Sequence, residues 1–144
     1  MDNKIKIMLT DVNEDARDML RDALEQTGRF VVTASTGNGS EVLQLLDETH
    51  PDLLVLDLLL PGLDGLAILR QMKKEDRPQI LVTSNFVNQA TAAEAGMLGA
   101  SMFLSKPYNE TAIIAICSCL LSTFLLLSVS YCLSRMRFIT SAIK

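Results

Sequence analysis

Five short apolar runs, separated by stretches with helical periodicity, constrain the fold of this chain more than any other feature of its sequence. The runs lie at residues 5–9, 30–33, 53–56, 80–82 and 101–105. The third run, Leu-Leu-Val-Leu, contains no polar residue, which is typical of a strand buried on both faces of a parallel sheet. Strands that alternate with helices form βαβ units. We therefore expect an α/β fold with a doubly wound sheet of five parallel strands.

Between these runs, apolar residues recur at the spacing of one helix face, so each interval is predicted to be a helix. Asn13 is the expected cap of the first helix, and Gly28 is its expected end. Ser40 is the expected cap of the second helix, and Pro51 ends it. The apolar residues expected to face the sheet are Ala16, Met19, Leu20, Ala23 and Leu24 in the first helix, and Val42, Leu43, Leu45 and Leu46 in the second. The other three expected helices are residues 66–72, 90–97 and 110–121.

Polar residues follow four of the five runs. Asp11 follows the first run, Asp57 the third, Thr83 the fourth and Lys106 the fifth. The carboxyl ends of parallel strands meet at one edge of the sheet, so these four side chains are expected to lie together. Two carboxylates, a hydroxyl and an ammonium suit phosphoryl transfer, with Asp57 as the candidate nucleophile. Asp11 is a candidate ligand of Mg²⁺, and Thr83 and Lys106 would stabilise the phosphoryl oxygens.

The motifs around these residues resemble those of one known family. The segment 51–69, PDLLVLDLLLPGLDGLAIL, resembles the phosphoacceptor segment of response-regulator receiver domains, in which Asp57 would be the phosphorylated residue. The segments 80–83 and 99–107 resemble later motifs of that family. Within the family, the closest resemblance is to the receivers of sporulation stage-zero master regulators. The resemblance implies a flavodoxin-like receiver fold with strand order 2-1-3-4-5.

The same resemblance implies roles for individual residues. Asp11 corresponds to the first residue of an acidic pair that binds Mg²⁺, and the backbone carbonyl of Leu59 would be a further metal ligand. Thr83 and Phe103 would be the switch residues, and Lys106 would be the cation of the site. A histidine kinase or a phosphotransfer protein would supply the phosphoryl group. The face formed by the fourth helix and the fifth strand would carry the signal.

The sequence departs from the family's pattern after its first strand. The family has two adjacent acids there, whereas this chain has Asp11 and Val12. Loss of one carboxylate weakens the binding of Mg²⁺. Ser84 is a second departure, since the family prefers a smaller residue beside the switch threonine. Two hypotheses follow: a receiver that is phosphorylated on Asp57, and a pseudo-receiver, which is a protein-interaction module whose metal site is disabled by Val12.

Turnover of an external substrate is not expected. Phosphatases that resemble haloacid dehalogenases also place a nucleophilic aspartate after an apolar strand, but they need a second aspartate two residues further on as a general acid. That position is Leu59 in this chain. The sequence therefore indicates a phosphorylated switch and not an enzyme.

Charge is distributed unevenly along the 144 residues. All 17 acidic residues lie in the first 110 positions, and only Arg135, Arg137 and Lys144 are charged beyond them. Such an acidic body argues against direct binding of nucleic acid. No cysteine precedes Cys117, and no secretory signal is present at the start of the chain, so we expect a cytoplasmic domain.

The C-terminal segment does not fit the family's pattern. Residues 112–134 carry no charge, and a helix of that length is long enough to span a bilayer. A receiver needs an amphipathic fifth helix at 110–121 instead. We therefore expect a receiver domain at 1–121 with an atypical hydrophobic last helix, an overlapping hydrophobic segment at 112–134 and a basic tail at 135–144. Three alternatives are open for residues 112–134. The segment is a membrane anchor, the oligomerisation helix of a homodimer, or a C-terminus that is not the natural continuation of the domain, as in a frameshifted or truncated gene product.

Overall fold

A five-stranded parallel sheet with the order β2-β1-β3-β4-β5 forms the centre of the computed structural model, which describes residues 3–85 and 88–121. This order is the predicted 2-1-3-4-5. The strands are β1 (Ile5–Thr10), β2 (Phe30–Thr36), β3 (Leu53–Asp57), β4 (Gln79–Ser84) and β5 (Met102–Ser105). The helices are α1 (Glu14–Gln26), α2 (Val42–Thr49), α3 (Gly65–Gln71), α4 (Gln89–Met97) and α5 (Glu110–Leu121), with a short 3₁₀ helix at Gly39–Glu41.

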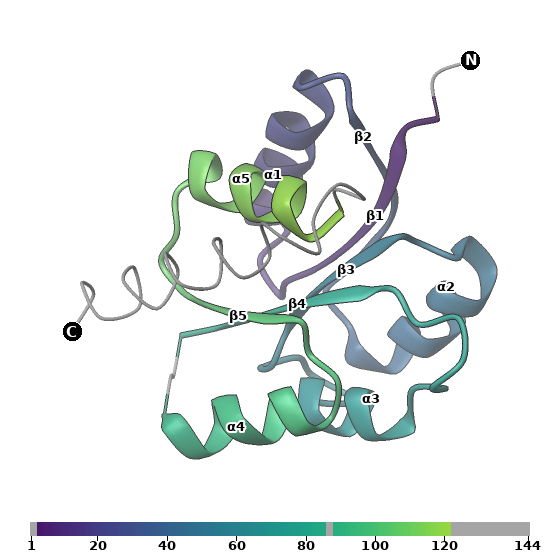
Figure 1. The fold of residues 1–144 in the computed structure, drawn as a ribbon, viewed down its shortest axis with the longest axis vertical. Coiled ribbons are helices and arrows are strands. Elements are labelled where there is room, and N and C mark those ends of the chain that lie inside the picture. Colours follow the sequence, from purple (N-terminus) through teal and green to yellow (C-terminus); the bar gives the residue numbers. More distant parts are fainter. Residues whose placement is uncertain (1–2, 86–87, 122–144) are drawn as a thin grey trace.

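Two layers of helices enclose the sheet (Figure 1). Helices α1 and α5 cover one face, where Leu20, Leu24, Ile113 and Ile116 pack against apolar side chains of the strands. Helices α2, α3 and α4 cover the other face and form a second apolar cluster with the sheet. The doubly wound α/β fold expected from the sequence is therefore confirmed.

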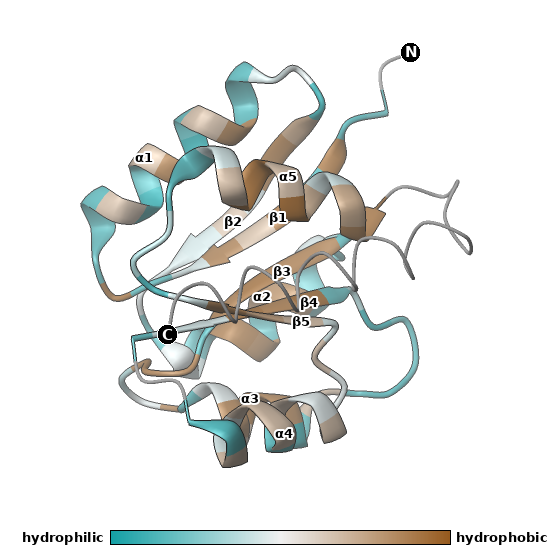
Figure 2. Cartoon of the chain, turned by 60° about the vertical axis from the view of Figure 1, so that its left-hand side comes forward, coloured by the Kyte–Doolittle hydropathy of each residue, from teal (hydrophilic) through white to brown (hydrophobic). Residues whose placement is uncertain are grey.

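Strand β3 lies in the middle of the sheet, between β1 and β4, and all five of its residues are buried. Full burial of a leucine side chain stabilises a fold by about 1.5–3 kcal/mol, so the apolar run 53–56 is a large contribution to the core. Figure 2 shows this apolar centre between the two helix layers. The same strand carries Asp57 at its carboxyl end, which places that residue on a rigid element.

Two predictions about the helices are wrong. Met19 was expected to face the sheet, but it is 62% exposed, because the stripe that packs inward is narrower and its fully buried members are Leu20 and Leu24. Ser40 was expected to cap the second helix. Asn38 instead accepts a hydrogen bond from the backbone of Ser40, and α2 begins after the 3₁₀ turn without a side-chain cap.

Helix α5 begins at Glu110, as expected from the sequence, and is described as far as Leu121; its buried residues are Ile113, Ile116 and Cys117. Within the described part of the chain, no helix is long and apolar enough to cross a membrane. Most of the hydrophobic segment 112–134, and the whole basic tail 135–144, lie outside the described residues.

Candidate functional site

The carboxyl edge of the sheet brings Asp11, Asp57 and Lys106 into direct contact. The Nζ of Lys106 lies 2.7 Å from Oδ2 of Asp11 and 2.6 Å from Oδ2 of Asp57. The side chains of Asp57, Asp11 and Lys106 are 5%, 13% and 13% exposed, so these charges are largely shielded from water. Charge-assisted hydrogen bonds of this length are stronger than neutral ones. The convergence predicted for these three residues is therefore observed.

Asp57 is fixed by both its backbone and its side chain. Its backbone N–H donates to the Thr10 hydroxyl at 2.9 Å, and its Oδ1 accepts from the backbone N–H of Leu59 at 3.0 Å. The next residue, Leu58, donates its N–H to the carbonyl of Thr83 on β4. The carboxylate is thus oriented by the two strands that flank β3 and by its own loop.

Asp11 is held at the end of β1 by the turn that follows it. Its Oδ1 accepts a hydrogen bond from the backbone N–H of Asn13 at 2.9 Å, and its carbonyl accepts from the guanidinium of Arg17 on α1. The side chain of Val12 is 62% exposed and offers no ligand. The next acidic residues in the sequence, Glu14 and Asp15, are exposed on the first turn of α1.

Thr83 lies beside Asp57 in the register of β3 and β4. It is 1% exposed, and its hydroxyl has no hydrogen-bond partner among the described residues. A buried hydroxyl without a partner carries a free-energy cost, which a bound ligand oxygen would remove.

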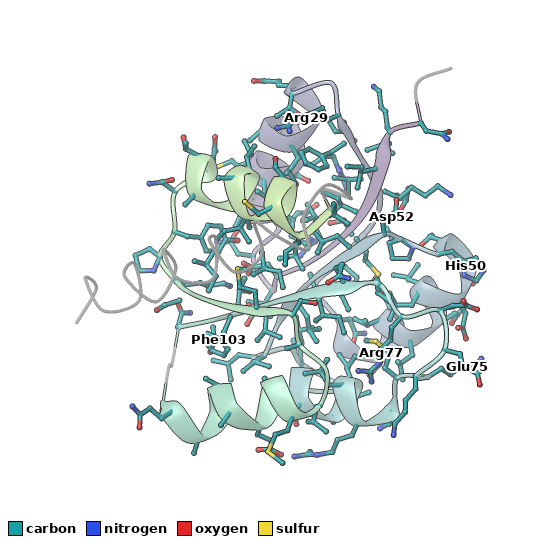
Figure 3. All side chains as sticks on the ribbon, in the orientation of Figure 1. Arg29, His50, Asp52, Glu75, Arg77 and Phe103 are labelled. Atoms are coloured by element: carbon teal, nitrogen blue, oxygen red, sulfur yellow. The ribbon has the colours of Figure 1, made fainter. Side chains whose placement is uncertain are left out.

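Phe103 pairs with Val82 and is partly buried, and Figure 3 shows it on the side of β5 that faces α4.

The electrostatics of the site favour a protonated Lys106. Burial alone would lower its pKa, but hydrogen bonds and charge interactions with Asp11 and Asp57 give a net rise above the usual 10.5. Burial also raises the pKa of Tyr108, which lies close enough to Lys106 and both carboxylates for their charges to act on it. Lys106 is therefore a fixed positive charge at neutral pH, as stabilisation of an anionic group requires.

Three residues of this site were missed by sequence reasoning: Thr10, Arg17 and Tyr108. Thr10 looks like the end of an apolar strand, Arg17 like a solvated helix residue and Tyr108 like part of a loop. No spacing pattern distinguishes them, because Thr10 and Arg17 act on backbone atoms that lie opposite them in the folded chain, and Tyr108 acts through burial close to Lys106 and the two carboxylates.

The donor set suits a hard cation with few protein ligands. Magnesium is commonly bound by one or two carboxylates, with water and phosphate oxygens completing its coordination. Asp11, Asp57 and the Leu59 carbonyl can supply such ligands, although the four carboxylate oxygens already accept hydrogen bonds from Lys106, Asn13 and Leu59. Within 3–85 and 88–121, no three His, Cys, Asp or Glu side chains form a metal-binding group. The residues therefore fit Mg²⁺ with one acidic ligand fewer than the resemblance implies.

The chain is thus a parallel α/β domain in which the aspartate at the carboxyl end of the central strand is hydrogen-bonded to a lysine that follows the last strand. A family model described as the response regulator receiver domain matches residues 7–118. The chain belongs to this family of receiver domains.

Solved structures give the same result. A two-component response regulator of the LuxR family from Aurantimonas sp. SI85-9A1 is 29% identical with a TM-score of 0.72, and the match covers 82% of this chain and 86% of that one. A signal receiver domain assigned to response regulator NarL from Mycobacterium tuberculosis is 27% identical with a TM-score of 0.74, covering 81% and 96%. The BeF3-activated receiver domain of RstA from Klebsiella pneumoniae is 20% identical with a TM-score of 0.72, and the match covers 81% of this chain and 99% of that one. At this identity the match supports the fold alone. The finer resemblance to sporulation regulators stays a prediction.

Proposed function

We propose that this receiver domain accepts a phosphoryl group on Asp57 from a histidine kinase or a phosphotransfer protein. The contact of Lys106 with both Asp11 and Asp57 is the observation that carries the proposal. A buried ammonium beside a buried carboxylate is ready to neutralise the charge of a phosphoryl group added to that carboxylate. As part of the same proposal, we assign the domain to the receivers of sporulation stage-zero master regulators, which its sequence resembles.

In the proposed reaction, a carboxylate oxygen of Asp57 attacks the phosphorus of the donor. A new O–P bond forms, the bond between phosphorus and the donor's leaving atom breaks, and that atom departs with the bonding electron pair. Lys106 would move its contact from the carboxylate to the phosphoryl oxygens, and the Thr83 hydroxyl would donate to one of them. Asp11, Asp57 and the Leu59 carbonyl would hold Mg²⁺, whose chemistry is to neutralise charge on the transferring group.

The signal would leave the site through β4 and β5. Thr83 lies at the end of β4, and Phe103 on β5 packs among the residues beside α4. Movement of Thr83 toward a phosphorylated Asp57 would open space for Phe103 and change the α4–β5 face. We place the domain in the cytoplasm. Its partner would be a histidine kinase or a phosphotransfer protein, a second copy of the chain is a further candidate partner, and no direct binding of nucleic acid is expected. A solved structure from Staphylococcus aureus is described as a DNA-binding response regulator, but at 19% identity it shows the fold alone.

The alternative is a pseudo-receiver that is never phosphorylated. The observation that favours it is Val12, which is exposed where the family has a second acid. In that case the Lys106 contacts would be permanent, and the α4–β5 face would bind its partner without a switch.

Incubation with acetyl phosphate and Mg²⁺, followed by intact-mass measurement, tests the proposal. We expect an adduct with the mass of one phosphoryl group on the wild type and on Asp22→Asn, which changes an exposed aspartate of α1. We expect none on Asp57→Asn. The absence of an adduct on the wild type at every Mg²⁺ concentration would favour the pseudo-receiver.

Val12→Asp should tighten the binding of Mg²⁺. An added carboxylate beside a divalent ion contributes about 1–3 kcal/mol after its desolvation is subtracted. Calorimetric titration measures the change. Met19→Asp is the matched control, because Met19 is also 62% exposed but lies on α1. Equal affinity in Val12→Asp and the control would mean that residue 12 is not at the metal site.

A further inference from the structure

The Thr10 side chain makes two hydrogen bonds to β3 that the backbone of a neighbouring strand would normally make. Its hydroxyl donates to the carbonyl of Val55 at 2.9 Å and accepts from the backbone N–H of Asp57, also at 2.9 Å. The paired register of β1 and β3 runs only from Ile7 with Leu53 to Leu9 with Val55. The Thr10 side chain therefore continues the contact between the two strands beyond the end of their backbone pairing.

The geometry of β3 explains why such a side chain is needed. Successive residues of a central strand direct their N–H groups to opposite neighbours. Leu58 donates to Thr83 on β4, so the N–H of Asp57 points to β1. Thr10 is 3% exposed and Asp57 is 3% exposed, so water does not replace the missing backbone partner. Without the hydroxyl, a buried N–H and a buried carbonyl would each lose a partner, which is costly.

The position of the carboxylate depends on this backbone. Oδ2 of Asp57 lies 2.6 Å from Nζ of Lys106, and its Oδ1 lies 3.0 Å from the N–H of Leu59. A small displacement of the Asp57 backbone would lengthen both contacts. Attack on phosphorus requires a closely defined approach, and a misplacement of an ångström lowers rates by about 100-fold.

We infer that Thr10 is a positioning residue, whose hydroxyl fixes the backbone of Asp57 and thereby sets the rate at which Asp57 takes up a phosphoryl group. The effect on the phosphorylation rate rests on the proposed function. The fixing of the Asp57 backbone rests on the two hydrogen bonds alone. Thr10 touches neither the donor nor the reacting atoms. It acts through Asp57, and only its hydroxyl matters.

The test compares Thr10→Val, which keeps the shape of the side chain, with Thr10→Ser, which keeps the hydroxyl. In the full chain with acetyl phosphate and Mg²⁺, Thr10→Val should slow phosphorylation by about 10- to 100-fold. Thr10→Ser should retain a rate within about threefold of the wild type, since the hydroxyl still serves both partners. Thr33→Val is the matched control. The Thr33 hydroxyl on β2 is buried and has no hydrogen-bond partner in the part of the chain that the structure describes, so its removal should leave the rate unchanged.

Hydrogen exchange of the Asp57 amide, followed by NMR, is the second readout. Thr10→Val should accelerate this exchange by at least about tenfold relative to the amides of β4, which global destabilisation alone would not do. If Thr10→Val does not fold, Thr10→Cys takes its place, because a thiol is a weak donor and acceptor that should give intermediate values.

The outcomes separate this inference from the proposed function. A wild type without an adduct refutes the proposed function, and the exchange of the Asp57 amide then decides whether Thr10 fixes that backbone. A phosphorylated wild type with an equally fast Thr10→Val refutes the positioning role. Equal slowing by valine and serine does so too, because serine keeps the hydroxyl and should then have preserved the rate.

Discussion

Lys106→Met should lower the free energy of unfolding by about 3–5 kcal/mol and abolish phosphorylation of Asp57. Removal of one partner from a buried ionic cluster leaves the other charges without compensation, which is costlier than the net value of the pair. Here two carboxylates, 5% and 13% exposed, would lose the only cation within salt-bridge distance of them among the described residues. Urea unfolding at neutral pH and intact-mass measurement after acetyl phosphate treatment give the two results.

The stability difference between Lys106→Met and the wild type should depend on pH. The pKa of Lys106 is raised above its unfolded value of 10.5, so its contribution is complete below pH 10.5 and is lost as pH rises through the folded pKa. The two proteins should therefore converge in strongly alkaline solution. Tyr108 also has a raised pKa and titrates nearby, so both proteins are measured with Tyr108→Phe.

Two substitutions serve as controls for Lys106→Met. Lys73→Met removes a cation whose contact with Asp47 is 3.9 Å long and exposed, and such pairs contribute less than about 1 kcal/mol. Lys106→Arg keeps the charge and should recover much of the stability. A loss in Lys106→Met no larger than in Lys73→Met would contradict the importance of the cluster.

Topology made the central part of the site predictable. Asp11, Asp57 and Lys106 each follow an apolar run, and parallel strands bring such positions to one edge, so their contact follows from the order of the elements. The apolar run 53–56 likewise predicted a strand that is buried on both faces of the sheet. These features depend on the apolar pattern of each run and on the alternation of strands with helices, and both can be read from the sequence.

The errors and omissions have a different physical origin. Met19 fits the helical spacing of a buried stripe, but the width of the stripe depends on how α1 and α5 share one face of the sheet. The choice of Asn38 over Ser40 as a cap depends on the 3₁₀ turn that precedes α2. Thr10 acquires its partners because the backbone pairing of β1 with β3 ends at the residue before it. Each of these facts is set by tertiary contacts.

The loop after β3, which carries Leu59, is held against the loop after β2. Gly39 donates its N–H to the carbonyl of Pro61 at 2.9 Å. A Cβ on Gly39 would lie only 1.7 Å from the carbonyl oxygen of Leu63 and 2.7 Å from its carbonyl carbon. These are backbone atoms, so a side chain at residue 39 cannot be accommodated by a change of rotamer, and one loop must move away from the other.

Gly39→Ala should lower the free energy of unfolding by at least about 3 kcal/mol, at the upper end of the range for overpacking. It should also slow phosphorylation, because a displaced β3–α3 loop takes the Leu59 N–H away from Oδ1 of Asp57. Gly96→Ala is the matched control: its Cβ meets nothing within 4 Å and it lies in α4, where alanine is favoured by about 0.5–1 kcal/mol. Urea unfolding of both variants should therefore give changes of opposite sign. A Gly39→Ala protein as stable as the wild type would show that the two loops are not in contact.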